Sequence, residues 1–195
     1  MTDPTTAKMV SYASPDGCQV ETVRVAMSGP ALRATGYIVS AGERAYGASY
    51  SVVADSEGRS RRITVRCDDA DGERSLAVTR SPGGPWVVES PTGSHPLPEL
   101  DDAVDVYLVG SAFAASLPIR RLGLQRQAGA DVTVTVASIS LPGLVVTPVQ
   151  HHGHNESVDA DGARIAYSGP FGEREFVVDA DGLFVSSEGL MSRLG

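Results

Sequence analysis

The sequence predicts a nearly all-β protein, and three observations support this class. Apolar and polar residues alternate with a period of two along most of the chain, which is the pattern of half-buried strands. Turn-forming residues separate the alternating segments, with 21 Gly and 12 Pro among 195 residues. Helical periodicity is scarce and is confined to 111–116 and 186–195, each long enough for one turn. We therefore expect many short strands and little helix.

The expected strands follow one another along the chain with short turns between them. They cover residues 19–27, 32–40, 46–54, 63–67, 74–80, 104–109, 117–124, 131–141, 144–149, 163–168, 174–179 and 183–187. The clearest alternation is in 131–141, where Val132, Val134 and Val136 share one face. The apolar side then changes at Ala137, and a change of parity within one strand predicts a bulge or a bend, as a curved sheet requires.

One acidic run recurs between expected strands. It reads VDADG at 158–162 and at 178–182, and DDADG at 68–72. An Asp-Gly pair flanked by β-type residues predicts a hairpin turn, because glycine adopts the positive φ that the turn needs. A calcium loop of the EF-hand type would place carboxylates at positions 1, 3, 5 and 12. Position 1 would be Ser157 or Val177 here, so the runs predict hairpins and not calcium sites.

All of these strands are expected to form a single domain over residues 1–195, with 1–15 as a candidate flexible N-terminal segment. No linker divides the chain, since the Pro-rich stretch at 90–100 is short enough to be a loop. The two cysteines, Cys18 and Cys67, lie far apart in the sequence. In a reducing compartment we expect them to be buried thiols and not a disulfide.

Charge and hydropathy exclude several classes of partner. The formal net charge of −8 argues against nucleic acid, because phosphate binding needs a basic surface. No stretch reaches the about 18 apolar residues of a membrane span. The first residues lack the charged start and the apolar core of a signal peptide, so we expect a cytoplasmic protein.

A histidine-rich run is the main candidate for chemistry. His151, His152 and His154 are followed by Glu156. In an extended segment His152 and His154 share one face, which suits a two-histidine metal site, while a solvated loop is the ordinary alternative. No nucleophile elbow or phosphate-binding loop is present in the sequence, so we expect no catalytic residue and no cofactor. A hydrolytic or metal-assisted enzyme that uses these histidines stays as an alternative.

Three charged residues fall among apolar neighbours. If 117–124 is a strand, Arg120 and Arg121 face opposite ways, and a guanidinium on the apolar side needs a carboxylate or a ligand anion. Glu21 is in phase with Val23, which places its carboxylate on an apolar face. We interpret Glu21 first as the partner of one of these arginines in an internal ion pair. The second interpretation is a polar anchor at the base of a ligand pocket.

The segment 105–124, DVYLVGSAFAASLPIRRLGL, resembles a motif of the bacterial putative glycolipid-binding family. That motif begins with Asp and continues through Thr or Ser into Pro-Phe-Thr-Asn-Thr-Leu-Pro-Ile-Arg-Arg-Leu. The segment 171–194 resembles the ending of the family, where a strand leads into Val-Asp-x-x-Gly-Leu-Val. Weaker similarities at 49–65, 85–91 and 139–150 extend the resemblance over nearly the whole chain.

The resemblance implies a spiral β-roll or half-barrel made of one curved antiparallel sheet, similar to lipoprotein carriers that hold acyl chains in a concave sheet. This chain departs from the motif, since Ser111, Ala112, Ala114 and Ala115 stand where the family has Thr, Pro, Thr and Asn. The loop keeps Phe113 but is expected to lose hydroxyl and amide groups that could hold a ligand or the loop itself.

The expected function is therefore the non-catalytic binding of a lipid or glycolipid in a concave sheet. The residues expected to meet the polar head are Arg120, Arg121, Glu21 and Gln150. The residues expected to contact the apolar part are Tyr50, Trp86, Tyr107 and Phe113. Burial of a twelve-carbon chain would contribute roughly 9–10 kcal/mol before ordering costs. A structural or partner-binding β-domain, filled by its own side chains, is the other alternative.

Overall fold

The structure, a computed structural model, describes residues 4–42, 44–169 and 172–195. In these residues the chain forms fifteen strands, one α-helix and three short 3-10 helices, which confirms the nearly all-β class. The strands are β1 (Thr6–Ala13), β2 (Gln19–Ser28), β3 (Ala31–Ser40), β4 (Tyr46–Ala54), β5 (Ser60–Asp69), β6 (Gly72–Arg80), β7 (Trp86–Ser90), β8 (Gly93–Pro96), β9 (Asp105–Leu108), β10 (Asp131–Ile139), β11 (Val146–Val158), β12 (Gly162–Gly169), β13 (Gly172–Asp179), β14 (Phe184–Ser187) and β15 (Met191–Arg193). The helical elements are η1 (Pro98–Leu100), η2 (Phe113–Ala115), α1 (Ser116–Leu122) and η3 (Leu124–Arg126).

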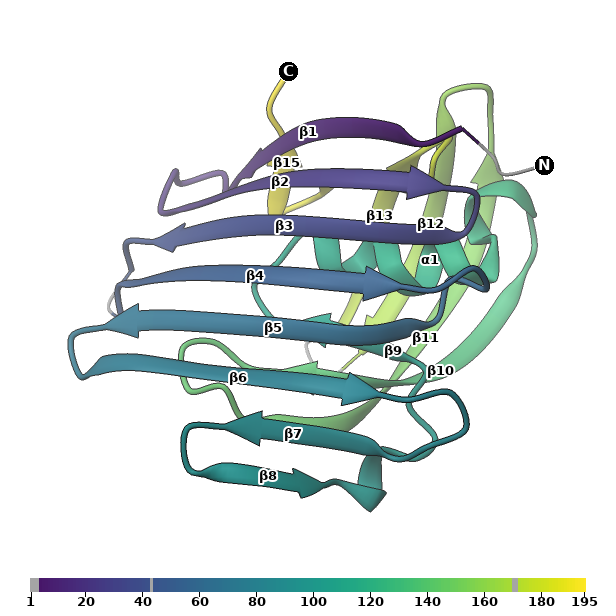
Figure 1. Cartoon of the computed structure of the whole chain (residues 1–195). Helices are drawn as coiled ribbons and strands as arrows, with labels where there is room; N and C mark the ends of the chain where they lie inside the picture. The colour runs from purple at the N-terminus through teal and green to yellow at the C-terminus, as the bar shows by residue number, and fades with distance from the viewer. Residues whose placement is uncertain (1–3, 43, 170–171) are drawn as a thin grey trace.

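The described strands form one open sheet whose edges are β8 and β9. Its order runs from β8 back to β1 and then from β15 back to β9, so that β1 pairs with β15 in the middle of the sheet. Neighbouring strands are antiparallel apart from β9 and β10, which pair in parallel. Figure 1 shows the sheet curved back on itself, with β10–β13 behind the broad face of β1–β8 and α1 between the two. The single curved sheet predicted from the sequence is therefore confirmed.

The inward face of the sheet follows the alternation of the sequence. In β5 the inward residues Ile63, Val65 and Cys67 are buried, as their phase predicts. Residues 6–13, expected within a flexible terminus, form β1 and pair with β2, because their alternation completes the sheet. Both cysteines are free thiols, but Cys18 is exposed because it lies in the turn before β2, so its predicted burial is wrong.

The strand predicted at 117–124 is wrong, because most of this segment forms α1. Pro118 lies in the first turn of the helix, where a missing N–H breaks no hydrogen bond. Gly123 ends the helix with a φ of 67°, a left-handed conformation that favours glycine. A segment of this length fits the periods of a strand and of a helix equally well. The helical turn expected at 111–116 is confirmed by η2, whereas the one expected at 186–195 is replaced by β14, a turn and β15.

The acidic runs form turns, as predicted. The run at 68–72 joins β5 to β6, and those at 158–162 and 178–182 join β11 to β12 and β13 to β14. In the second run Asp159 Oδ1 accepts the backbone N–H groups of residues 161 and 162 at 2.8 and 3.0 Å. In the third run Asp179 Oδ1 accepts those of residues 181 and 183 at 3.0 and 2.9 Å. The first aspartate of each of these turns therefore stabilises its own turn.

The change of parity in β10 has a cause other than the predicted bulge. The pairing of β10 with β11 runs without a register shift from residue 131 to residue 139. Residues 136–139 are all buried, because this end of β10 is covered on both faces. A strand that is buried on both faces loses its alternation without a bulge. Figure 1 shows β10 as a curved strand, which agrees with the predicted bend.

Residues 97–126, which we call the inner segment, contribute β9 to the edge of the sheet and otherwise run through its hollow (Figure 1). Leu100, Phe113, Ile119 and Leu124 of this segment have almost no solvent exposure. Trp86 of β7 packs on the same side and donates its indole N–H to the carbonyl of residue 103 at 2.9 Å. The inner segment therefore fills much of the space that the sheet encloses.

No helix in the described residues is long and apolar enough to cross a bilayer. The cytoplasmic location stays a prediction of the sequence.

Candidate ligand-binding site

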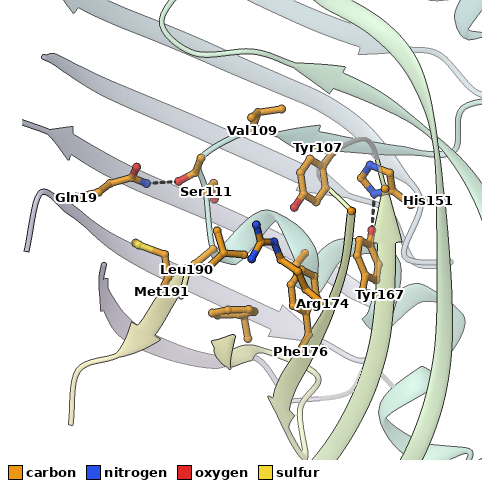
Figure 2. A pocket seen from close by; sticks show the side chains of 16 residues that line it. Gln19, Tyr107, Val109, Ser111, His151, Tyr167, Arg174, Phe176, Leu190 and Met191 are labelled. Carbon is orange, nitrogen blue, oxygen red and sulfur yellow. Dashed lines mark hydrogen bonds between the residues drawn. The ribbon is translucent and has the colours of Figure 1, made fainter. Parts of the chain in front are cut away.

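A cavity of about 310 Å³ opens between the inner segment and strands β11–β14 (Figure 2). Its volume is at the lower end of the range of about 300–1,000 Å³ that is typical of small-molecule sites. Aromatic and aliphatic residues form most of its lining. The lining residues are Gln19, Tyr107, Val109, Gly110, Ser111, Ala112, Ala115, His151, Tyr167, Gly169, Gly172, Arg174, Phe176, Phe184, Leu190 and Met191.

One wall of the cavity is a continuous series of rings, which we call the aromatic wall. Tyr107 meets His151 with ring centroids 4.7 Å apart, and His151 meets Tyr167 at 5.2 Å. Tyr167 stacks on Phe176 at 4.7 Å, and Phe176 meets Phe184 edge to face at 5.4 Å. The rings come from inward positions of β9, β11, β12, β13 and β14, so the sheet itself positions them. Each such pair stabilises the fold by about 0.5–1.5 kcal/mol beyond the contribution of its buried surface, so the rings hold one another in place.

The titratable groups of the aromatic wall are neutral. Burial lowers the pKa of His151 to about 4, so its imidazole carries no charge at pH 7. Burial also raises the pKa of Tyr167, which keeps its phenol protonated. His151 Nδ1 and the Tyr167 hydroxyl share a hydrogen bond of 2.5 Å, since a neutral imidazole and a phenol can form one in either direction. This pair satisfies the polar atoms that would otherwise face an apolar cavity.

Glu21 holds the loop that forms the floor of the cavity. Its fully buried carboxylate accepts hydrogen bonds from the Tyr50 hydroxyl at 2.6 Å and from Ser111 Oγ at 2.5 Å. It also accepts the backbone N–H groups of Ala112 at 2.7 Å and Phe113 at 3.2 Å. Burial raises the pKa of this carboxyl group, and the four donors oppose the shift. The predicted ion pair with an arginine is wrong, because neutral donors saturate both oxygens.

The geometry of this network depends on a glycine in the strand between its partners. Tyr50 of β4 reaches Glu21 of β2 by lying across Gly36 of β3, with which it pairs. A Cβ at residue 36 would overlap the Tyr50 ring. The hydroxyl of Ser111 also contradicts the expectation that the loop has lost its polar groups, since Ser111 donates to Glu21 and accepts the N–H of Ala114 at 3.1 Å.

Arg120 and Arg121 fasten α1 to its surroundings and do not line the cavity. Arg121 donates from Nε and Nη2 to Oδ2 of Asp105 at 2.9 and 2.7 Å. Asp105 is fully buried, and burial raises the pKa of its carboxyl group although Arg121 opposes the shift. Arg120 donates to the backbone carbonyls of Asp181 and Gly29. The anion that a buried guanidinium was expected to need is therefore Asp105 of the chain itself.

The other predicted ligand residues lie in four different places. Tyr107 lines the cavity, and Phe113 lies under its floor, stacked on Tyr50 with centroids 6.5 Å apart. Trp86 is buried against the inner segment, outside the cavity lining. Gln150 is exposed on β11 and does not line the cavity either. Their roles in binding stay predictions, and the structure brings Tyr107 to the site.

The exposed histidines lie on the opposite face of β11 from His151. His152 Nε2 and His154 Nδ1 are 3.3 and 3.7 Å from the two carboxylate oxygens of Asp131, so these histidines share a face as predicted. Within the described parts of the chain, no group of three or more His, Cys, Asp or Glu residues is arranged to hold a metal ion. His151 belongs instead to the aromatic wall.

The sequence analysis missed Arg174 and Phe176. Arg174 is in phase with Phe176 and Val178 in β13, and the latter two are buried. This phase was visible in the segment 174–179 and could have placed an arginine on the inward face at the end of the strand. Only the pairing of β13 with β12, whose Tyr167 lies opposite Arg174, shows that this face borders a cavity.

Two solved structures have a similar fold. A DUF1089 family protein from Pseudomonas aeruginosa matches with a TM-score of 0.75 and 23% identity, over 93% of this chain and 95% of the other. A β-barrel-like protein of the domain of unknown function DUF1849, from Brucella abortus, matches with a TM-score of 0.52 and 12% identity, over 98% and 94%. No match was found among the curated proteins. The model of a family described as "Putative glycolipid-binding" matches residues 9–193.

Proposed function

Because the chain belongs to the putative glycolipid-binding family, we propose that it binds an amphipathic lipid or glycolipid in this cavity without catalysing a reaction. The observation that carries this proposal is the apolar cavity between the inner segment and the aromatic wall. The tail of the ligand would lie against the aromatic wall and contact Tyr107. Glu21, Tyr50 and Phe113 would act from beneath by fixing the floor.

The size of the cavity limits the part of the ligand that it encloses. A water molecule occupies about 30 Å³ in the liquid, so 310 Å³ corresponds to about ten groups of that size. A methylene group is similar in size, which suits a tail of about eight carbons or the end of a longer one. Burial of eight methylenes contributes about 6 kcal/mol before ordering costs, so the expected affinity is modest.

The polar groups of the site favour binding over catalysis. Ser111 donates its hydroxyl to Glu21, and His151 is paired with Tyr167. Ser111 is also held by the backbone N–H of Ala114, and its partner Glu21 already accepts four hydrogen bonds, so this pair fixes the loop. The imidazole of His151 is bonded to Tyr167 and not to Ser111, unlike the histidine that activates serine in hydrolases. The hydrolytic alternative would also involve His152 and His154, which face Asp131 outside the cavity.

Filling the cavity tests the proposal. We expect octyl glucoside to bind at one saturable site, measured by calorimetric titration, and Ala115→Leu to weaken its binding about tenfold or more by occupying the same space. Because Ala115 is buried, Leu190→Trp blocks the cavity from its exposed rim as a second variant. Val39→Trp, on an outward position that is 61% exposed, is the matched control and should bind as the unaltered protein does.

The absence of saturable binding for every octyl amphiphile would favour the structural β-domain over the binding protein. Equal binding by the two cavity variants and the control would show that the ligand sits elsewhere on the molecule.

A further inference from the structure

We propose that Arg174 makes the cavity selective for amphiphiles with an anionic oxyacid head, such as a carboxylate or a phosphate ester, at the end of an apolar tail. This inference rests on the proposed function and adds the chemistry of the head group. The residues that carry it are Arg174 and its neighbours on β13, together with the neutral lining of the cavity.

Arg174 is held at the mouth of the cavity by the alternation of β13. Its position is in phase with the buried Phe176, whereas Glu173 and Glu175 alternate with it and belong to the outward face. Figure 2 shows its guanidinium extending from β13 toward Leu190, on the far side of the opening. The guanidinium thus lies where the head of a ligand would emerge once the tail is enclosed.

The guanidinium of Arg174 has no hydrogen-bond or ion-pair partner among the described residues. Neighbouring arginines do have partners, since Arg164 pairs with Glu175 at 2.7 Å and Arg193 pairs with Asp179 at 2.9 Å. The chain carries 24 acidic residues and 16 Lys and Arg residues, so carboxylates that could pair with a cation outnumber the cations. An arginine that is left without one beside a cavity is available to an anion from solution.

Arg174 is also the one charged residue among the described residues that line the cavity. His151 and Tyr167 of the aromatic wall are neutral at pH 7. The nearest buried carboxylate under the floor, that of Glu21, is already saturated by four donors. A ligand anion at the mouth would therefore meet a positive charge with no acidic side chain in the lining to compete for it.

The chemistry of the guanidinium selects the kind of head. Arginine stays charged at all physiological pH values and presents a planar set of donors that matches both oxygens of a carboxylate or a phosphate. A neutral sugar could accept the same hydrogen bonds, but it would lack the Coulomb attraction between an anion and the guanidinium. The shared feature of the favoured heads is thus an oxyanion, whether it comes from a fatty acid or from a phospholipid.

Four ligands with the same eight-carbon tail test this inference: octanoate, octyl phosphate, octanol and octyl glucoside. We expect the two anions to bind about tenfold more tightly than octanol at low salt, as a charge-assisted contact at a partly solvated site predicts. Arg174→Gln should abolish this difference while leaving the affinity for octanol unchanged. The preference between octanoate and octyl phosphate then identifies the source of the anion.

Two further variants separate the contact from the general field of the protein. Arg174→Lys keeps the charge but loses the planar donors and should retain part of the selectivity. Arg164→Gln removes a charge three strand positions away on the outward face of β12, where Arg164 pairs with Glu175, and should change no affinity. Added salt should narrow the gap between the anions and octanol, because the mouth is open to solvent.

The outcomes distinguish this inference from the proposed function. If all four ligands bind equally and Arg174→Gln alters none of them, the selectivity is refuted while lipid binding stands. If octyl glucoside binds most tightly in both proteins, the site recognises a neutral sugar and the inference is overturned. If none of the four binds saturably, the proposed function itself fails.

Discussion

Around Trp86 and α1 the inner segment fills the hollow of the sheet with its own side chains, whereas beside β11–β14 a cavity remains and a second hollow opens between β6–β8 and residues 143–146. In the filled half Trp86, Leu100 and Ile119 have no measurable exposure. In the open half Tyr107 and Phe176 border about 310 Å³ of free space. A concave sheet is therefore not a binding site by itself, because a crossing segment can occupy it, and the space left over determines what can bind.

Each half contains a buried carboxyl group, and the two are stabilised in different ways. Asp105 in the filled half is paired with the guanidinium of Arg121. Glu21 under the open half is surrounded by two hydroxyl and two backbone N–H donors. An ion pair fixes one side chain against another, whereas a set of backbone donors fixes the path of the loop itself. Glu21 thus fixes the backbone of the loop that forms the floor of the cavity.

Truncation of one large side chain in each half provides the strongest test of this comparison. We expect Trp86→Ala to lower the free energy of unfolding by about 4 kcal/mol, because it opens a void in a packed region and removes the hydrogen bond to residue 103. Tyr107→Ala, next to existing free space, should lower it by only about 2 kcal/mol. Urea denaturation measures both changes.

Ligand titration of the same two variants completes the test. Trp86→Ala should retain the affinity for an octyl amphiphile, while Tyr107→Ala should lose most of it. Equal losses of stability, or a loss of binding in the Trp86 variant alone, would show that the two halves are packed alike.

Removal of a partner from the buried ion pair has the next largest expected effect. Arg121→Ala should lower the free energy of unfolding by about 3 kcal/mol, because it leaves the carboxylate of Asp105 buried without a counter-charge. The double variant Arg121→Ala with Asp105→Asn should recover part of this loss, since the remaining side chain is neutral. If the double variant is no more stable than the single one, the loss comes from packing and not from charge.

The pH dependence of the free energy of unfolding tests whether water is excluded from His151 in the aromatic wall. An exposed histidine has a pKa of about 6.5, and burial lowers that of His151 to about 4. Between these values the unfolded chain binds more protons than the folded one, so the stability that His151 contributes is present above pH 6.5 and is lost as the pH falls through 4. We expect this loss to be about 3 kcal/mol between pH 7 and pH 4.

Variants of two adjacent histidines isolate this effect. His151→Asn should remove the loss from the pH profile of the unfolding free energy, whereas His152→Asn, at an exposed position, should retain it. A profile that both variants leave unchanged would mean that water reaches His151 and that the wall is not apolar in solution.

The fold could be predicted from the sequence to a large extent because its signals are local. Alternation in β5 and β10 and the Asp-Gly turns each depend on a few adjacent residues, and the motif at 105–124 placed the chain in its family. The helix α1 escaped prediction because a short segment with Pro118 and Gly123 satisfies two periods at once. The contacts that this segment makes inside the sheet, and not its own sequence, select the helix over the strand.

The site was harder to predict because its residues are gathered from distant parts of the chain. Glu21 and Tyr107 were identified by their phase and their chemistry, but the donors that surround Glu21 come from residues about 30 and 90 positions away. The arginines that appeared most suited to a ligand, Arg120 and Arg121, are used within the protein. Arg174 gave a weaker signal, because what distinguishes it is the lack of a hydrogen-bond or ion-pair partner among the residues that the structure describes, which no sequence pattern reveals.

The pairing of β1 with β15 affects the order in which the chain can fold during synthesis. Residues 12 and 13 pair with residues 192 and 193, which the ribosome adds on the order of ten seconds later at typical rates. The pairing of β1 with β15 cannot form before then. Until then the edge of β1 offers unpaired backbone groups to any other extended chain. The two halves of the sheet therefore join only after β15 has been synthesised.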